Sequence, residues 1–348
     1  MSTLTVTTFI IGVTSSCNLE CGYCFARSGF KNTKMTNETL KSVIHEIDSL
    51  GLKSVRFLWH GGEPLLLGLK GFEYALEIQR SASTNFLNTI QTNATLIDND
   101  FADFFATNKF SIGVSVDGYE DVQNANRPMS YNRPSFDRVI RGIKLLQDRD
   151  LKFSCISVIS DKTDSEKYFE FISNLGVRSF AIKPSTSTWE HSIDLISYTV
   201  FYQEVMKRWL DLDDPNLIFR NFMGYAENLL SGKNMKPLCS QSGFCGHFAF
   251  ITPNGDVFPC DQLDDPKYRW GNINDTSLQK IIDSKKRQDF LEAVERRNKE
   301  CEESCVAFSA CQGGCSFCHE FYTESKYCDH LRAIVESVRE SVACVLED

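Results

Sequence analysis

Apolar runs alternate with longer amphipathic segments through the first half of the chain. The runs predict strands at residues 5–13, 54–59, 88–91, 110–116, 152–159 and 179–182. The amphipathic segments between them predict helices at residues 36–50, 71–82, 97–106, 135–147 and 165–175, with Asn37 as the cap of the first. Alternation of this kind indicates a parallel sheet covered by helices. Since eight such units close a barrel, six predict an α/β fold with a partial, TIM-like (β/α)6 barrel.

The pattern changes in the second half. Residues 196–230 predict one or two connecting helices, and short strands follow at 248–251 and 256–258 among many turns. A last helix is predicted at 330–345. We therefore expect a barrel at residues 1–190, a helical bridge at 191–235 and a cysteine-rich domain at 236–348. The last segment offers little apolar surface to bury, so bound metal is expected to stabilise it.

Charge and hydropathy exclude several classes of partner. The formal net charge of −9 argues against nucleic acid, because phosphate binding needs a basic surface. There is no run of eighteen apolar residues that would span a membrane. The N-terminus has neither a basic region nor a small-residue cleavage site, so it does not resemble a signal peptide. We expect a cytoplasmic protein.

Cysteine usage is the most unusual feature of the composition. Fourteen cysteines in a chain without an export signal are not expected to form disulfides. Two, Cys155 and Cys344, stand apart and are predicted to be core residues. The others form an N-terminal group of three and a C-terminal group comprising Cys239, Cys245, Cys260, Cys301, Cys305, Cys311, Cys315, Cys318 and Cys328. Clustered intracellular cysteines indicate metal binding.

The N-terminal group has the spacing Cx3Cx2C and directly follows the first predicted strand. Its members, Cys17, Cys21 and Cys24, would supply three thiolates on one tight loop. Three thiolates suit three corners of a [4Fe–4S] cube and leave the fourth iron open to a small molecule. Structural zinc is the alternative, but it needs four ligands, and no further Cys or His lies near this loop.

This spacing at the end of a first strand resembles the radical S-adenosylmethionine superfamily. The resemblance implies that Tyr23 packs on the adenine of the cofactor. It also implies that Gly61, Gly62 and Glu63 bind the methionine amino group, since glycines allow close approach and a carboxylate can hold an ammonium. A Gly-Gly-Glu segment alone is more often only a turn. Its position after the cysteine loop favours a role in cofactor binding here.

Two further segments resemble the subfamily that contains anaerobic sulfatase-maturing enzymes and many peptide maturases. The first runs from Gln91 to Asn93 and the second from Ser115 to Gly118, with Arg127 shortly after. The resemblance implies that the serine and the arginine contact the ribose and the methionine carboxylate. The alternatives are a turn residue and a surface charge. The resemblance also assigns Gln91 and Asn93 to the binding of S-adenosylmethionine.

The sequence departs from the usual pattern of this subfamily in two places, which makes the subfamily assignment less specific. Ala94 stands where a glycine often follows Asn93, and the region of Gln123 replaces a histidine that is frequent in the subfamily.

The C-terminal cysteines resemble the SPASM extension, which carries two auxiliary [4Fe–4S] clusters. Carried over, the first cluster takes Cys239, Cys245, Cys260 and Cys315. The second takes Cys301, Cys305, Cys311 and Cys328. Three residues separate Cys301 from Cys305, where the family usually has two, so Cys318 remains an alternative ligand. These clusters are expected either to carry electrons or to act only as structural staples.

Asp261 follows Cys260 directly. In the sulfatase-maturing relatives an aspartate at this place is proposed to take a proton from the substrate, so we predict Asp261 as a catalytic base. The alternative is a turn-capping residue. His60 is expected to pack or hydrogen-bond within the Gly-Gly-Glu turn rather than to bind metal.

Taken as a whole, the resemblance implies three [4Fe–4S] clusters and S-adenosylmethionine as cofactors. We expect a ferredoxin or flavodoxin as the reductant and a precursor peptide or a protein as the substrate. The favoured prediction is an oxidative cross-link, a carbon–carbon cyclophane or a thioether, in a ribosomally made peptide. The alternatives are formylglycine formation on a sulfatase and a non-catalytic electron carrier. Because the cysteine loop begins at Cys17, a leader peptide is expected to bind the barrel, the C-terminal domain or a separate recognition protein.

Overall fold

The computed structural model describes residues 6–24, 33–185, 190–231, 239–241, 245–322 and 324–347. The chain divides into two compact units assembled from separate stretches of sequence. The first unit comprises Met1–Ser115, Pro128–Phe153 and Gly246–Glu292, and the second comprises Val116–Arg127, Ser154–Cys245 and Ala293–Asp348. Because these units are not contiguous in sequence, the predicted domain bounds at residues 190 and 235 stay predictions.

A mostly parallel sheet forms the centre of the first unit. Its strands lie in the order β10-β9-β8-β1-β2-β3-β4. Their bounds are β1 Thr8–Thr14, β2 Ser54–Gly61, β3 Asn85–Thr92, β4 Ser111–Ser115, β8 Phe248–Ile251, β9 Asp256–Phe258 and β10 Gly271–Asn272. Strands β1 to β4 pair in parallel, as the alternating pattern predicts. Nearly all of β1 is buried, as is typical of an inner strand of a parallel sheet.

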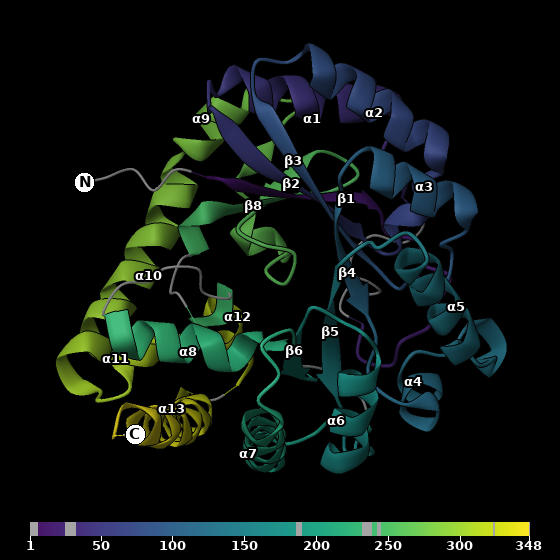
Figure 1. Cartoon of the computed structure of the whole chain (residues 1–348). Helices are drawn as coiled ribbons and strands as arrows, with labels where there is room; N and C mark the ends of the chain where they lie inside the picture. Colours follow the sequence, from purple (N-terminus) through teal and green to yellow (C-terminus); the bar gives the residue numbers. More distant parts are fainter. Residues whose placement is uncertain are drawn as a thin grey trace. The chain divides into compact units, whose positions relative to one another are not determined.

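Helices line the outer side of this sheet (Figure 1). They are α1 Asn37–Ser49, α2 Leu69–Ser81, α3 Asn99–Thr107, α5 Phe136–Gln147 and α9 Leu278–Ile282. In α1 the buried residues Leu40, Val43, Ile44 and Ile47 follow the spacing of an amphipathic helix. Thr36, not the predicted Asn37, caps this helix, because its hydroxyl accepts the N–H of Thr39 and leaves Asn37 as the first helical residue.

The hairpin of β8 and β9 joins the C-terminal part of the chain to the sheet. Strand β8 pairs in parallel with β1, with Thr8 opposite Phe248, and β9 pairs antiparallel with β8. The predicted bounds of both strands are confirmed. Their sequence gave no indication that β1 would be the partner. As a result, Cys260 and Asp261, which follow β9, belong to the same unit as β1 and β2.

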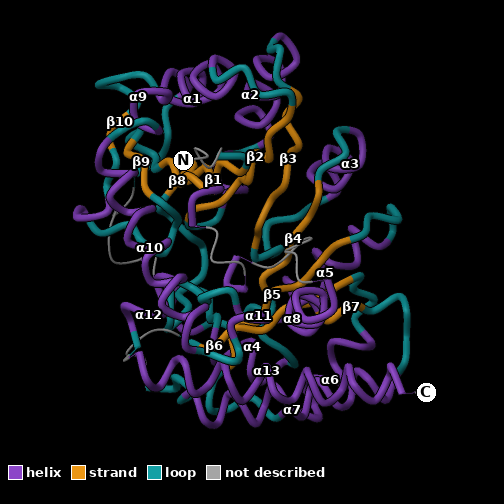
Figure 2. Tube along the Cα trace, turned by 90° about the vertical axis from the view of Figure 1, so that its left-hand side faces the viewer, coloured by secondary structure: helices purple, strands orange, loops and turns teal. Residues whose placement is uncertain are grey.

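The second unit is mainly helical. Its strands are β5 Phe153–Ile159, β6 Ser179–Pro184 and β7 Ile218–Phe219, paired in parallel. Its helices are α4 Glu120–Asn126, α6 Ser165–Asn174, α7 Leu195–Leu212, α8 Arg220–Ser231, α11 Phe308–Cys311, α12 Ser316–Phe321 and α13 Glu324–Glu347. Helices α7 and α13 pack side by side (Figure 2). Cys155 is buried in β5, as predicted, whereas the side chain of Cys344 lies outside the described residues.

Five helices within the described residues were not expected from the sequence. Helix α10, Lys285–Ser304, occupies a segment predicted to be rich in turns, and α4, α9, α11 and α12 are short. The sequence of α10 is dominated by Lys, Arg, Glu and Gln, which favour helix but provide little apolar periodicity. Short 3₁₀ helices complete the structure at Pro64–Leu67, Ser130–Asn132, Cys239–Gln241, Cys245–His247 and Pro266–Tyr268.

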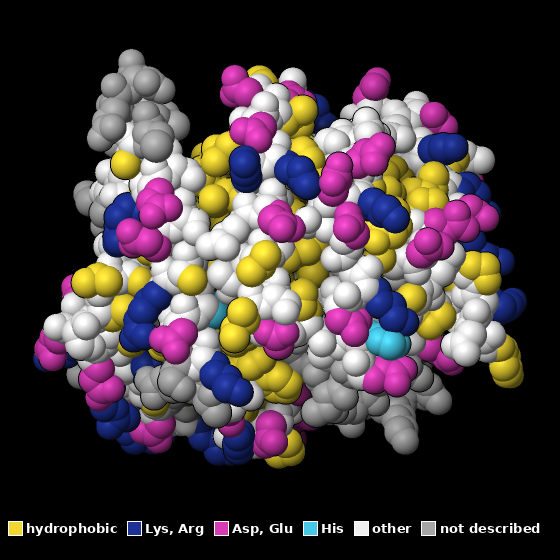
Figure 3. Space-filling model, turned by 90° about the horizontal axis from the view of Figure 1, so that it is seen from below, with side chains coloured by type: hydrophobic (Ala, Val, Ile, Leu, Met, Phe, Trp, Pro, Cys, Tyr) yellow, Lys and Arg dark blue, Asp and Glu magenta, His cyan; other side chains and the backbone are white. Residues whose placement is uncertain are grey.

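Membrane insertion and a basic binding face were both excluded from the sequence. None of the helices within the described residues has the length and apolar character needed to cross a bilayer. On the face drawn in Figure 3, acidic and basic side chains are interspersed with apolar ones. On this face (Figure 3) the basic side chains are mixed with acidic ones rather than gathered in one cluster.

Candidate active site

The cysteine loop begins immediately after β1 and gathers its three thiols in one apolar cluster. Leu19, Cys21 and Met129 form the buried centre of this cluster, and Cys17, Tyr23 and Cys24 pack against it. The N–H of Leu19 donates to the sulfur of Cys17 at 3.4 Å. The structure therefore brings the predicted triad together and places Tyr23, the predicted adenine contact, beside it.

Asn93, at the end of β3, braces this loop. Its amide nitrogen donates to Asn18 Oδ1 at 3.0 Å and lies 3.8 Å from Cys17 Sγ. Asn18 in turn donates to the hydroxyl of Thr95 at 2.7 Å. The residue that the sequence assigns to cofactor binding thus also fixes the position of the first cysteine.

The two glycines at the end of β2 allow the loop to lie directly against that strand. A Cβ at Gly61 would come within 2.3 Å of the carbonyl oxygen of Thr14, and one at Gly62 within 2.1 Å of that of Ser16. Gly62 N–H donates to Thr14 O at 2.7 Å, and Glu63 N–H donates to Ser16 O at 2.9 Å. Side chains here would push the cysteine loop off β2, so the glycines are needed for packing whether or not they also contact a ligand.

Glu63 is buried and accepts hydrogen bonds from one hydroxyl and two backbone N–H groups. Its Oε1 accepts from the hydroxyl of Thr92 at 2.7 Å and from the N–H of Leu65 at 3.0 Å, and its Oε2 accepts from the N–H of Asn93 at 2.8 Å. Burial raises the pKa of this carboxyl to about 7, although the three hydrogen bonds oppose the shift. Glu63 therefore ties the ends of β2 and β3 together, beside the loop it helps to hold.

Gln91 and Ser115 also meet at the carboxyl ends of their strands. The amide of Gln91, in β3, donates to the hydroxyl of Ser115, at the end of β4, at 2.8 Å. Both were predicted to bind the cofactor, and their juxtaposition follows from the parallel pairing of β3 with β4. Gln91 lies two residues before Asn93, and Ser115 lies two residues before Asp117. Polar side chains therefore follow one another at the carboxyl ends of these strands.

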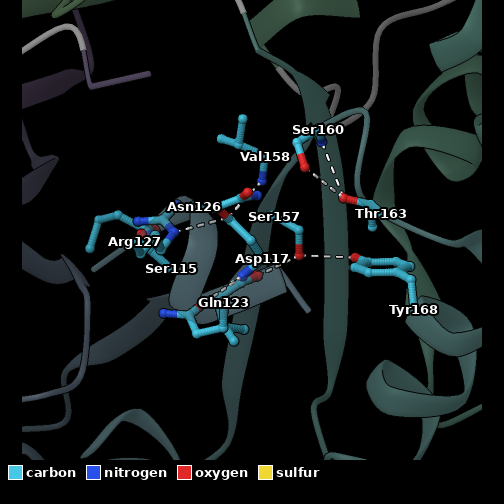
Figure 4. Close-up of polar contacts among 12 residues, drawn as sticks. Ser115, Asp117, Gln123, Asn126, Arg127, Ser157, Val158, Ser160, Thr163 and Tyr168 are labelled. Carbon is cyan, nitrogen blue, oxygen red and sulfur yellow. Dashed lines mark hydrogen bonds and ion pairs between the residues drawn. The ribbon is translucent and has the colours of Figure 1, made fainter. Parts of the chain in front are cut away.

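In the second unit, Arg127 is held by Asp117. The Nε of Arg127 lies 2.9 Å from Asp117 Oδ1, and Asp117 is fully buried. Figure 4 shows Asp117 between Arg127 on one side and the β5 residues Ser157 and Val158 on the other. The alternative that Arg127 is a surface charge does not fit, since this side chain is about nine-tenths buried.

Asp261 faces His60 across a small hollow in the first unit. The distance from Asp261 Oδ2 to His60 Nδ1 is 3.8 Å, and both side chains keep 19% of their surface exposed. The hollow is lined by residues from the end of β1, the Gly-Gly turn, β8 and the segment after β9: Gly12, Thr14, Ser15, His60, Gly61, Gly62, Phe250, Pro253, Asp261 and Asp264. The predicted base therefore lies next to the turn that was predicted to bind S-adenosylmethionine.

Asp264 was not identified from the sequence. It lines the same hollow, and its pKa is raised, first by burial and then by the negative charge of Asp261. The sequence signal was its place three residues after Asp261, but only the fold shows that both carboxylates face one space. His60 was expected to pack or hydrogen-bond within the turn, and in the structure it lies opposite Asp261.

The C-terminal thiols of the second unit separate into two groups. Burial raises the pKa of Cys311 to about 11, with further contributions from the charges of Cys305, Cys301 and Cys328. These four cysteines come from α10 and its C-terminal end, α11 and α13, and they are the four assigned to the second auxiliary cluster.

The other group contains Cys245, Cys315 and Cys318. Cys245 interacts with Cys315, and its thiol lies 3.1 Å from the hydroxyl of Ser316. A hydrogen bond with Cys318 lowers the pKa of Cys315. Cys318 thus lies with the first predicted auxiliary set rather than with the second. Cys239, also in this unit, is exposed, and Cys260 belongs to the first unit.

The donor sets fit iron–sulfur clusters better than single ions. Within the part of the chain that the structure describes, no three Cys, His, Asp or Glu side chains converge as the ligands of one metal ion would. In a [4Fe–4S] cube each thiolate binds its own iron, so the thiols surround a larger volume. Thiols gathered in groups of three and four match that requirement.

Comparison with known proteins identifies the same two parts. A model of the Radical SAM superfamily matches residues 11–174, and a model of the SPASM iron–sulfur cluster-binding domain matches residues 244–319. The cysteine-type anaerobic sulfatase-maturating enzyme of Clostridium perfringens strain 13 is 29% identical over 348 residues, covering 92% of this chain and 93% of that protein. The serine-type enzyme of Bacteroides thetaiotaomicron is 28% identical and covers 86% of this chain and 80% of its own length.

Solved structures give a consistent result. Native anSMEcpe with bound AdoMet is 27% identical, has a TM-score of 0.87 and covers 98% of this chain and 100% of its own. Streptococcus suis SuiB bound to the precursor peptide SuiA is 18% identical, has a TM-score of 0.66 and covers 92% of this chain and 74% of its own. At that identity the likeness to SuiB shows the fold alone.

These findings decide several expectations. The α/β partial barrel with a C-terminal SPASM domain is confirmed, and so are S-adenosylmethionine and [4Fe–4S] clusters as the cofactors. The electron-carrier alternative is set aside. The relatives favour sulfatase maturation over the peptide cross-link that the sequence favoured. The chain belongs to the radical S-adenosylmethionine enzymes with a SPASM domain.

Proposed function

We propose that this enzyme oxidises a cysteine or serine side chain of a protein substrate to the aldehyde of formylglycine. The observation that carries the proposal is the place of Asp261, which faces His60 beside the Gly-Gly turn at the end of β2. The sulfatase-maturating enzymes, to which nearly the whole chain is similar, support the same substrate class. Their names specify cysteine-type and serine-type activities, and both remain open for this chain.

Three [4Fe–4S] clusters are proposed for the chain. Cys17, Cys21 and Cys24 would hold the first, and the two C-terminal sets would hold the auxiliary pair. When bound and reduced, the first cluster and S-adenosylmethionine supply a 5′-deoxyadenosyl radical, which removes a hydrogen atom from the substrate. Tyr23, Gly61, Gly62, Glu63, Gln91, Asn93, Ser115 and Arg127 are proposed to bind or position S-adenosylmethionine.

The residues of the hollow are proposed to complete the oxidation. Oxidation of a serine side chain to an aldehyde, or of a cysteine side chain to a thioaldehyde, removes two electrons and two protons in total. Water would then convert the thioaldehyde to the aldehyde and release the sulfur as hydrogen sulfide. Hydrogen abstraction accounts for one of each. Asp261 would accept the remaining proton, and an auxiliary cluster would accept the remaining electron. Cys260 precedes Asp261 in the chain, so the proton acceptor and a proposed ligand of the first auxiliary cluster are adjacent.

His60 and Asp264 would shape the environment of the base. His60 can hydrogen-bond to the carboxylate after a small approach, because the two side chains are 3.8 Å apart and each is partly exposed. Asp264 adds a second carboxyl, whose pKa is raised first by burial and also by the negative charge of Asp261.

A product assay tests this function. The reconstituted enzyme would be incubated anaerobically with S-adenosylmethionine, a flavodoxin or ferredoxin reductant, and the Cp18Cys peptide that anSMEcpe binds. Formylglycine would appear as an aldehyde that reacts with a hydrazide and is located by fragment mass spectrometry. The serine counterpart of the peptide would separate cysteine-type from serine-type activity. A product that has lost two hydrogens and contains no aldehyde would instead support a cross-link.

The electron donor and any recognition protein are also proposals. A small ferredoxin or flavodoxin is expected because the first cluster must be reduced before each turnover. If the natural substrate is a precursor peptide, a separate leader-recognition protein is a candidate partner. Co-purification of the enzyme with the product of a neighbouring gene would test this directly.

A further inference from the structure

A buried carboxylate at the end of β4 has more partners than any role assigned so far requires. Asp117 Oδ1 accepts the N–H of Val158, in β5, at 2.9 Å, and the same oxygen lies 2.9 Å from Arg127 Nε. Its Oδ2 accepts from the amide of Asn126 at 3.3 Å. One carboxylate thus links the end of a strand, the last turn of α4 and the neighbouring strand (Figure 4).

Helix α4 brings the two charged residues together. It begins at Glu120 and ends at Asn126, so Asp117 precedes it and Arg127 is its C-terminal cap. Gln123, in the middle of the helix, is fully buried, and its side-chain oxygen accepts the N–H of Asp117 at 2.9 Å. Its carbonyl accepts the N–H of Arg127 at 2.9 Å. Gln123 replaces the histidine frequent in the subfamily, and it holds both ends of this turn without adding a titratable group.

A second layer fixes the β5 side of the group. The hydroxyl of Ser157 donates to the carbonyl of Val116 at 2.6 Å and accepts from the hydroxyl of Tyr168 at 2.9 Å. Both Ser157 and Tyr168 are fully buried. Asp117 is therefore attached to a rigid part of the second unit, and a guanidinium that it holds has little freedom to change direction.

From this geometry we propose that Asp117 is a positioning residue, which orients the guanidinium of Arg127 toward the methionine carboxylate of S-adenosylmethionine. The inference rests on the proposed contact of Arg127 with that carboxylate. An arginine held through Nε can still direct the edge formed by its Nη atoms, and that edge matches a carboxylate in a bidentate pair. A mobile arginine would have to lose side-chain freedom at each binding event.

The charge of Asp117 also has an opposing effect. A carboxylate beside Arg127 reduces the attraction of the guanidinium for a second carboxylate, so neutralising Asp117 would strengthen binding if charge alone mattered. Neutralisation would weaken binding if orientation matters more. We expect orientation to dominate, because a bidentate pair depends on direction and Asp117 is the acid paired with Arg127. The sign of the change therefore distinguishes the two roles.

The test measures the dissociation constant of S-adenosylmethionine for the reconstituted, unreduced enzyme by equilibrium binding, without turnover. Arg127→Gln tests the contact itself and should weaken binding. Asp117→Asn keeps the shape of the side chain and should weaken binding about 10- to 100-fold, as is typical when the partner of a binding group is removed. Asp103→Asn is the control, since Asp103 pairs with the Nε of Arg149 but is largely exposed in the first unit.

The double variant separates positioning from general loss of structure. If Asp117 acts through Arg127, adding Asp117→Asn to Arg127→Gln should cause little further loss of affinity. Additive losses, or tighter binding in Asp117→Asn, would overturn the proposal. If Asp117→Asn does not fold, Asn126→Ser removes a single contact to the carboxylate. Unchanged affinity in that variant would contradict the proposal. Unchanged affinity in Arg127→Gln would remove its basis while leaving the aldehyde product assay unaffected.

Discussion

The two thiol-rich regions of the molecule are organised in opposite ways. Cys17, Cys21 and Cys24 lie within eight residues on one loop, and an amide, two glycines and an apolar cluster hold that loop in place. In the second unit the set around Cys311 is gathered from three helices across some thirty residues of sequence. The first set is formed by residues close in sequence, whereas the second is assembled by tertiary packing.

This contrast separates two chemical tasks. A short loop with three thiols leaves one iron of a [4Fe–4S] cluster without a protein ligand, and that iron can bind S-adenosylmethionine. Four thiols from separate helices can complete a cluster, which then carries electrons or stabilises the domain. Substitutions in the cysteine loop should therefore abolish the radical chemistry. Substitutions among the C-terminal thiols should affect later steps or stability.

The largest effect is expected from the triple variant Cys17→Ala, Cys21→Ala and Cys24→Ala. S-adenosylmethionine cleavage should fall below detection, because these three thiols are the ones proposed to hold the cluster that binds it. Iron content should fall from about twelve to about eight per chain, four for each [4Fe–4S] cluster. Quantifying 5′-deoxyadenosine and iron in the reduced enzyme tests both statements. Continued cleavage would show that the open iron lies elsewhere. About four irons per chain together with bound zinc in the unaltered enzyme would contradict the two auxiliary clusters.

Asp261→Asn should act after the radical step. Loss of the general base should slow product formation roughly a hundredfold or more, while S-adenosylmethionine cleavage continues. The ratio of aldehyde product to 5′-deoxyadenosine is the measurement. His60→Gln provides a matched variant, since it keeps a polar group beside Asp261 and should reduce this ratio less. If the ratio of aldehyde to 5′-deoxyadenosine is unchanged in Asp261→Asn, Asp261 is a turn residue and not the base. If the variant loses iron, the role of Asp261 is structural.

Glu63 makes the loop region sensitive to pH. Its pKa is raised to about 7 from an ordinary value of 4.5, so the folded chain holds this proton more tightly than the unfolded chain. Stability should therefore decrease as pH rises from about 4.5 to about 7, by about 3 kcal/mol from this group. Glu63→Gln should flatten that part of the thermal-stability profile. The exposed Asp103→Asn should leave it unchanged, and an equally steep profile in Glu63→Gln would assign the dependence to other groups.

The smallest effect is expected from Cys318→Ala. Cys318 interacts with Cys315, while the set around Cys311 already has four thiols of its own. Iron content should therefore remain at about twelve per chain. Cys315→Ala is the comparison and should lower it. A loss of about four irons in Cys318→Ala would show that this thiol is a ligand and that the carried-over assignment needs revision.

Much of the site was predictable because its motifs are local. The Cx3Cx2C loop, the Gly-Gly-Glu turn and the polar residues at the ends of β3 and β4 each follow a strand, and parallel strands place their carboxyl ends at one edge of a sheet. Pairing of β1 to β4 then brings Cys17 to Asn93 and Gln91 to Ser115. A one-dimensional pattern of strands was sufficient for that step.

Other features required long-range packing. Helix α10 was missed because its charged sequence has little apolar periodicity. Ala94 was read as a departure from glycine, and its backbone indeed has a positive φ of 60°, a conformation that glycine adopts at lower cost. Asp264 could not be assigned to the hollow because its relation to His60 depends on where the β8–β9 hairpin pairs.

The sequence by itself determined the class of the fold, the cysteine loop and the family of chemistry, because strand periodicity and short motifs are encoded by neighbouring residues. Tertiary structure decided which distant groups meet. Pairing of β8 with β1 brought Asp261 to His60, folding of α4 brought Arg127 to Asp117, and helix packing assembled the thiols around Cys311. Such contacts depend on the burial and hydrogen bonding of whole elements, and no local pattern specifies the partner of an element.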